Sequence, residues 1–139
     1  MVVIAILGIL AVTAVPFYQT WLQRAYGSQA TLMMKGLVDG QIMYYLEQNT
    51  FFPSDKVPII IPYEGQGTPS PEGALGKIEE ALNVKISQSR QFRYTISNSE
   101  AYGLGVTIEA PFPLFKDQGS PGSLSAVVTK QGEVTYIGP

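Results

Sequence analysis

Apolar residues fill most of the first 23 positions of the chain, and charged residues appear only after them. Seventeen of the 23 are apolar, and the first ionisable side chain is Arg24. An α-helix rises about 1.5 Å per residue, so 23 helical residues reach about 35 Å. That length exceeds the roughly 30 Å hydrocarbon core of a bilayer. The pattern therefore predicts a helix that can cross a membrane or lie in an apolar core, provided that it continues through Pro16.

A helical period continues past the proline and extends the predicted helix to about Gln48. Phe17, Trp21 and Ala25 recur at a spacing of four residues, as on one face of a helix. Phe52-Pro53 then ends the pattern, because the residue before a proline is biased away from helical geometry. One helix of about 48 residues far exceeds the mean of about 11–12, so it must project beyond a small domain.

The second half of this helix carries an apolar stripe bordered by polar residues. The stripe consists of Leu22, Ala25, Leu32, Met33, Gly36, Leu37, Gly40, Met43 and Tyr44. A surface helix buries its apolar face against its own domain. We therefore expect Leu32, Leu37, Met43 and Tyr44 to be buried between this helix and the rest of the protein.

The remainder of the chain predicts a short helix and several strands. The proline-rich segment after the long helix contains Val57–Ile61, which fits a short edge strand because prolines are tolerated there. Glu72–Leu82 has helical spacing. Phe92–Ile96 and Leu104–Ile108 alternate as strands do, with a turn between them at Asn98–Glu100.

The C-terminal segment predicts a hairpin between Leu124–Thr129 and Glu133–Ile137. A three-residue loop that ends in a left-handed Gly132 would pair Val128 with Val134 and keep the apolar faces together. A two-residue loop would mix those faces, so we expect the longer loop.

The predicted fold class is α+β, a long N-terminal helix whose C-terminal half packs on an antiparallel sheet of about four strands. All charged side chains lie in residues 24–139. The chain therefore divides into an apolar helix at 1–23 and a globular domain at 24–139, which holds the amphipathic half of the helix and the sheet.

Composition and charge exclude several classes of function. A net charge of −2 disfavours nucleic acid as a partner. Without His or Cys, the chain lacks the usual zinc ligands and most activated nucleophiles. No Ser-Lys or paired-carboxylate signature replaces them. We therefore expect no enzymatic activity, no cofactor and no metal.

A run of small and branched apolar residues opens the chain: Ala5-Ile6-Leu7-Gly8-Ile9-Leu10-Ala11, followed by Ala14, Pro16 and Tyr18. This run resembles the N-terminal helix of type IV pilins and of the related type II secretion pseudopilins. Tyr44-Tyr45, followed by Phe51-Phe52-Pro53, is similar to the end of that helix and its exit into a loop.

This resemblance implies a pilin fold and the function of a major structural subunit that polymerises with copies of itself. The helix would hold the chain in the lipid of the inner membrane, and pilus assembly machinery would move it into a filament on the cell surface. The related pseudopilins form a periplasmic filament instead. The implied filament-core residues are Ile4, Leu7, Gly8, Leu10, Pro16, Phe17 and Trp21.

The resemblance also implies that the helix unwinds over Gly8–Val15 in the filament, since glycine and proline weaken it there. The family's N-terminal aromatic residue and early glutamate are absent. Either about six further residues precede Met1, which would lengthen the span so that it fully crosses a bilayer, or this protein lacks the family's pairing of that glutamate with a neighbour's N-terminal amine. The family's frequent C-terminal disulfide is also absent.

Two weaker sites remain as alternatives within this resemblance. Some pseudopilins bind calcium in a C-terminal loop, where this chain offers Asp117 and Ser120, but calcium takes about six to eight oxygen ligands. Lys116, Lys130 and Arg93 would form a basic patch only if the fold brought them together.

Two other interpretations of the apolar start compete with a pilin. Val12-Thr13-Ala14 resembles a signal-peptide cleavage site, although no basic residue precedes the apolar run and the helical pattern continues beyond it. A membrane-anchored periplasmic domain that binds a ligand or catalyses a reaction would also use a single apolar helix.

Overall fold

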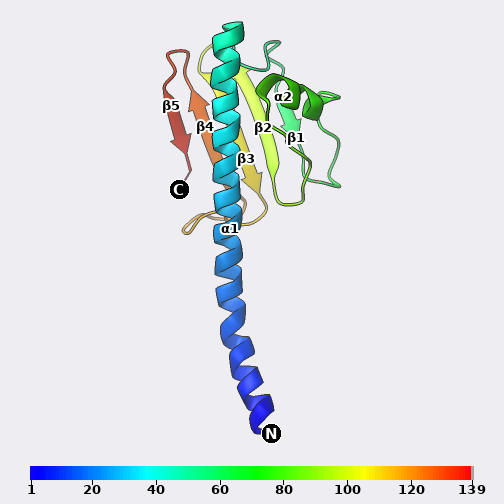
Figure 1. The fold of residues 1–139 in the computed structure, drawn as a ribbon, viewed down its shortest axis with the longest axis vertical. Coiled ribbons are helices and arrows are strands. Elements are labelled where there is room, and N and C mark those ends of the chain that lie inside the picture. The colour runs from blue at the N-terminus through cyan, green and yellow to red at the C-terminus, as the bar shows by residue number, and fades with distance from the viewer. Residues whose placement is uncertain (139) are drawn as a thin grey trace.

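One helix runs through most of the length of the molecule and carries a sheet on one side of its upper half (Figure 1). The computed structural model describes residues 1–138. Helix α1 spans Val2–Gln48 without a break at Pro16, so the predicted long helix is confirmed. It ends where Asn49 adopts a left-handed conformation with φ of 57°, and its N–H donates to the carbonyl of Tyr45.

The sheet is antiparallel, and its five strands lie side by side in chain order. They are β1 (Ile59–Ile61), β2 (Arg93–Ser99), β3 (Gly103–Ala110), β4 (Gly122–Val128) and β5 (Val134–Ile137). Helix α2 (Ala74–Leu82) lies between β1 and β2 in sequence and packs against α1 and β1. The predicted α+β class is confirmed, and the proline-flanked segment is indeed an edge strand.

The predicted C-terminal hairpin has the predicted register. Val128 pairs with Val134, and the loop between them has Gly132 at φ of 85°. The N–H of Thr129 donates to Glu133, which leaves a three-residue loop between these two residues. The side-chain period of two favours this register, since a loop one residue shorter or longer would turn the apolar residues outward.

The turn between β2 and β3 begins later than predicted. Strand β2 runs to Ser99, and the turn occupies Glu100–Tyr102. Asn98 stays in the strand because its side-chain amide donates to the carbonyls of Phe51 and Pro53. Asn98 is of a residue type that favours turns, but here its side chain anchors the loop that follows α1.

The core lies between α1, α2 and one face of the sheet. Alternate residues of β2, β3 and β4 are buried on this face, and the residues between them are partly or fully exposed on the other. The largest fully buried side chains include Phe92, Met34, Leu37, Ile59, Ile61, Ile78, Ile96, Leu104, Ile108 and Leu114. The result is a two-layer α+β domain from which the front half of α1 projects (Figure 1).

Candidate assembly surface

The front half of α1 presents an apolar surface that the protein itself does not cover. Every residue from Met1 to Trp21 is exposed, and these residues are called the stalk below. By length and composition α1 is able to cross a membrane. An uncovered apolar surface of this size is costly in water and marks a site for lipid or for another protein.

The side chains predicted for a filament core all lie on this stalk. Ile4 is 73% exposed and Phe17 is 76% exposed, so neither contributes to the core of the domain. The full set comprises Ile4, Leu7, Gly8, Leu10, Pro16, Phe17 and Trp21, and each of these residues is exposed. They are available together for contacts outside the chain.

The stalk is helical throughout but has a weak segment. Pro16 has no N–H, so the carbonyl of Val12 loses its regular helical partner. The hydroxyl of Thr13 donates to Ile9 and Leu10, at 3.2 and 3.0 Å, and therefore does not compensate Val12. Gly8 has open space where a Cβ would lie, so packing does not hold it. The helix is thus easiest to unwind between glycine and proline.

Aromatic side chains mark both ends of the contact between α1 and the domain. Tyr18 and Trp21 are exposed and stacked on each other, with ring centroids 6.3 Å apart. At the other end Tyr45 stacks on Phe51 at 4.6 Å, within the domain. The aromatic residues therefore form separate groups, one at the stalk boundary and one in the core.

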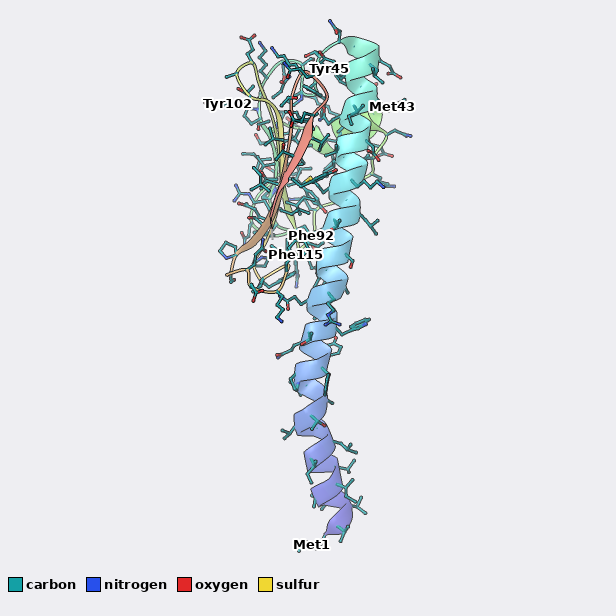
Figure 2. All side chains as sticks on the ribbon, turned by 90° about the vertical axis from the view of Figure 1, so that its left-hand side faces the viewer. Met1, Met43, Tyr45, Phe92, Tyr102 and Phe115 are labelled. Carbon is teal, nitrogen blue, oxygen red and sulfur yellow. The ribbon has the colours of Figure 1, made fainter. Side chains whose placement is uncertain are left out.

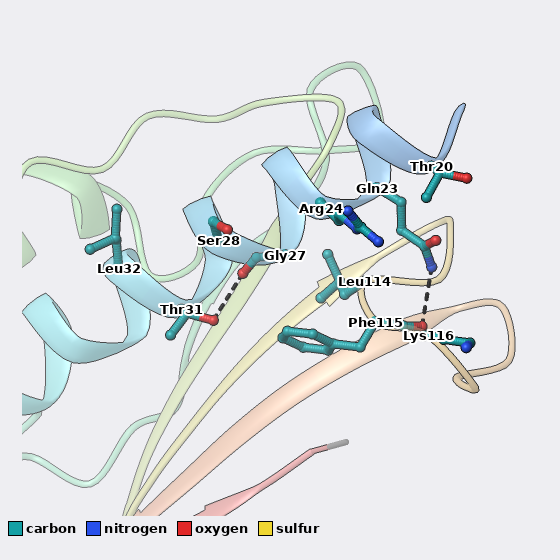
Figure 3. Close-up of a pocket in the computed structure, with 10 residues that line it drawn as sticks. All are labelled: Thr20, Gln23, Arg24, Gly27, Ser28, Thr31, Leu32, Leu114, Phe115 and Lys116. Carbon is teal, nitrogen blue, oxygen red and sulfur yellow. Dashed lines mark hydrogen bonds between the residues drawn. The ribbon is translucent and has the colours of Figure 1, made fainter. Parts of the chain in front are cut away.

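The domain begins to contact α1 at Leu22 and Gln23, which are half-buried. The amide of Gln23 donates to the carbonyl of Phe115 at 3.1 Å and ties the helix to the loop before β4 (Figure 3). A Cβ on Gly27 would lie 2.6 Å from the carbonyl of Leu114, so glycine permits the loop to approach this closely.

The face of α1 that meets the sheet is rotated from the predicted stripe. Its buried residues are Gly27, Ala30, Met34, Leu37, Val38 and Gln41. Leu37 is fully buried and Tyr44 is partly buried against the core. The prediction that Leu32 and Met43 lie under the sheet is wrong, because they are 71% and 59% exposed. Figure 2 shows Met43 on the side of the helix turned away from the sheet.

The physical reason for this error is that the real contact uses small and polar residues. Gly27 and Ala30 let backbones approach, and hydrophobicity alone gives them little weight. Gln41 is fully buried; its amide donates to the carbonyl of Phe52, and its Oε1 accepts from the N–H of Phe52. A signal for this face existed in the sequence, since these residues recur at helical spacing around Leu37.

The weaker candidate sites are not assembled. Among residues 1–138 no three His, Cys, Asp or Glu side chains gather as a metal site. Lys116 lies in the loop before β4 and Lys130 in the loop after it, at opposite ends of that strand. Arg93 lies 3.8 Å from Glu109 in an ion pair. The basic patch that these three cations would form is therefore absent from the described residues.

Burial and pairing shift the pKa of three groups in the domain. Burial raises the pKa of Tyr94 to about 12 and also raises the pKa of Tyr63. A hydrogen bond from Lys56 lowers the pKa of Glu100, at the surface. These shifts have structural causes, namely burial for the two tyrosines and the pairing with Lys56 for Glu100.

A long helix with an exposed apolar half, laid across an antiparallel sheet, is a pilin-like architecture. The chain is 35% identical over 85 residues to a curated protein, the fimbrial protein of Neisseria meningitidis serogroup A / serotype 4A. The match covers 61% of this chain and 45% of that protein, so it spans less than half the length of the relative. This match confirms the resemblance to type IV pilins. No family model matches the chain, and no solved structure matches it significantly.

Proposed function

We propose that the chain is a major structural subunit of a type IV pilus-like filament and polymerises through its stalk. The observation that carries this proposal is the exposure of all 21 stalk residues on a chain whose domain has a separate buried core of its own. A structural subunit needs a surface for its neighbours and no catalytic centre. The similarity to a fimbrial protein supports the same conclusion.

Before polymerisation the stalk would reside in the inner membrane with the domain outside the lipid. A helix satisfies its own backbone hydrogen bonds, which is what a lipid environment requires. Pilus assembly machinery would then transfer the subunit to a filament on the cell surface. The exposed apolar side chains would exchange lipid for the stalks of other copies.

Cryo-electron microscopy of filaments sheared from cells that express the chain tests this proposal. We expect the stalks to bundle in the filament centre and the sheets to face water. A periplasmic filament with no surface filament would identify a pseudopilin instead. A membrane-bound monomer with an ordered small molecule in its domain would contradict both and favour a membrane-anchored binding or enzymatic protein.

Within the filament we expect the stalk to unwind over Gly8–Val15. Unwinding lengthens each subunit, and the freed carbonyls and N–H groups then need partners inside the bundle. Replacing both Gly8 and Pro16 with Ala should stiffen the stalk and change the axial rise or the extensibility of the filament. An unbroken helix through residues 8–16 in a filament map would contradict this mechanism while leaving the filament itself intact.

A further inference from the structure

A groove of about 930 Å³ lies where α1 leaves the domain. One wall is the first turns of α1 inside the domain, and the other is the loop before β4. Figure 3 shows Thr20 and Gln23 at the stalk end of the groove and Leu32 at its far end. Arg24 lines this groove on the helix side, and Lys116 lines it on the loop side.

These two cations lack carboxylate partners among residues 1–138. The ion pairs in that part of the chain are Lys56–Glu100, Arg90–Glu64 and Arg93–Glu109, and neither Arg24 nor Lys116 takes part in one. None of the groove's lining residues is acidic. The groove also contains the hydroxyl of Ser28, which donates to no group in the described residues. Two positive charges and a free hydroxyl are suited to an anion with several oxygens.

The level of the groove relative to a bilayer indicates which anion it meets; this step rests on the proposed membrane location of the stalk. The helix carries no charged side chain up to Gln23, so the charge of Arg24 is the first that has to lie outside the hydrocarbon. Arg24 therefore lies at the level of the lipid headgroups. The exposed Tyr18 and Trp21 lie just below it, in the position that aromatic residues favour at a membrane boundary.

We propose that this groove binds the phosphate of an anionic phospholipid between Arg24 and Lys116. Two cations on opposite walls form a weak site for a free phosphate in solution. At the bilayer surface lipid phosphates are held at high effective concentration, so a weak site becomes occupied. The ring of Phe115, which lines the groove and is only partly buried, can meanwhile contact the carbon atoms next to the phosphate.

The stalk of a second copy fits the groove less well than a lipid. The stalk that a neighbour would offer has no acidic residue, because the first ionisable side chain of the sequence is Arg24. A neighbouring stalk in the groove would leave both cations without a counter-charge. Charge complementarity therefore favours the lipid.

The test uses the full chain in nanodiscs that contain phosphatidylglycerol and phosphatidylcholine in equal amounts with identical acyl chains. Native mass spectrometry then measures which lipid stays bound to the protein. We expect a preference for phosphatidylglycerol, and an approximately fivefold loss of that preference in either Arg24→Gln or Lys116→Gln. The double variant should lose little more than either single variant, because both side chains hold one phosphate. Lys35→Gln, an exposed cation on the same helix outside the groove, should keep the preference.

Several results would overturn the proposal. An equal loss of lipid preference in Lys35→Gln would indicate that the positive charges of the surface attract the lipid without a defined site. Displacement of the lipid by excess inorganic phosphate would indicate a site for free anions. A cross-link from Lys116 to an acidic residue of a second copy would place protein in the groove. Normal insertion without lipid preference would contradict this inference alone. Failure to insert would contradict the proposed function and this inference with it.

Discussion

The two halves of α1 belong to one continuous helix but differ in how their apolar surface is covered. From Met1 to Trp21 every side chain is exposed. From Gly27 to Gln41 one face is buried against the loop before β4, the sheet and α2. The front half is apolar around its whole circumference and buries none of it, whereas the back half buries one face and mixes charged with apolar residues on the other.

This difference separates the residues that fold the subunit from those that assemble it. The back half completes a core within one chain, so its sequence is constrained by the shape of the sheet. The front half needs only surroundings that exclude water, either lipid or the stalks of other copies. The same secondary structure therefore serves stability in one half and association in the other.

Removal of residues 1–21 should produce the largest change. Because the domain buries none of these side chains, we expect a folded domain that is soluble and monomeric. Membrane fractionation and analytical ultracentrifugation measure the result, with the full chain as the control. A truncated chain that still enters membranes or polymerises would show that the stalk is not the assembly element.

Aspartate substitutions on the buried and on the exposed face of the back half should differ clearly in their effect on stability. Leu37→Asp would bury an unpaired charge and should lower the free energy of unfolding by about 3 kcal/mol or more. Leu32→Asp places the same charge on the exposed face and should stay within about 0.5 kcal/mol of the parent. Urea unfolding of the truncated domain measures both, and similar values would mean that the buried face is assigned incorrectly.

Two glycines on α1 provide a finer comparison. A Cβ on Gly40 would lie 2.7 Å from the carbonyl of Leu82, so Gly40→Ala should destabilise the domain by about 1–3 kcal/mol. Gly36 has nothing within 4 Å of that position. Gly36→Ala should therefore stabilise the helix by about 0.5–1 kcal/mol. Thermal melts of the two variants should shift in opposite directions, and a shift in the same direction would contradict the close contact of α1 with α2.

The smallest effect should come from alkaline titration of the core beneath the back half of α1. Burial raises the pKa of Tyr94 from 10.0 to about 12, so the folded state holds this proton more tightly than the unfolded state. This stabilisation of the folded state is fully present below pH 10 and is lost as the pH rises towards 12. The free energy of unfolding should therefore fall by about 1 kcal/mol between pH 9 and 11. Tyr94→Phe should reduce this loss, and an unchanged pH profile would show that Tyr94 is not its source.

Periodicity alone was sufficient to predict much of the fold. The long helix, the strand pairs and the hairpin register follow from periods of 3.6 and 2 together with turn chemistry. The turn after β2 was misplaced because Asn98 has a tertiary role, in which it bonds to Phe51 and Pro53. No local pattern reports a hydrogen bond to a segment about 45 residues away.

The sequence predicted the surface of the front half of α1 better than that of the back half. The exposed stalk could be predicted because it is apolar on all sides and contains no charge. Hydrophobicity did not predict the buried face of the back half, because Leu32 and Met43 are apolar yet exposed, whereas Gln41 is polar yet buried. Which face of a helix meets a sheet depends on how closely the two backbones can approach and on whether buried backbone polar groups find hydrogen-bond partners. Hydrophobicity measures neither property.

The chain-order arrangement of the sheet has a consequence for how the protein is made. Strands β2, β3 and β4 each pair with the next strand along the chain, so these contacts are local and should form early in folding. The contacts of α1 with β3 and β4 close the longest loops and should form last. A membrane favours helix formation before any tertiary contact exists. An inserted stalk would therefore present the back half of α1 as a ready template, onto which the newly synthesised sheet docks as its final step.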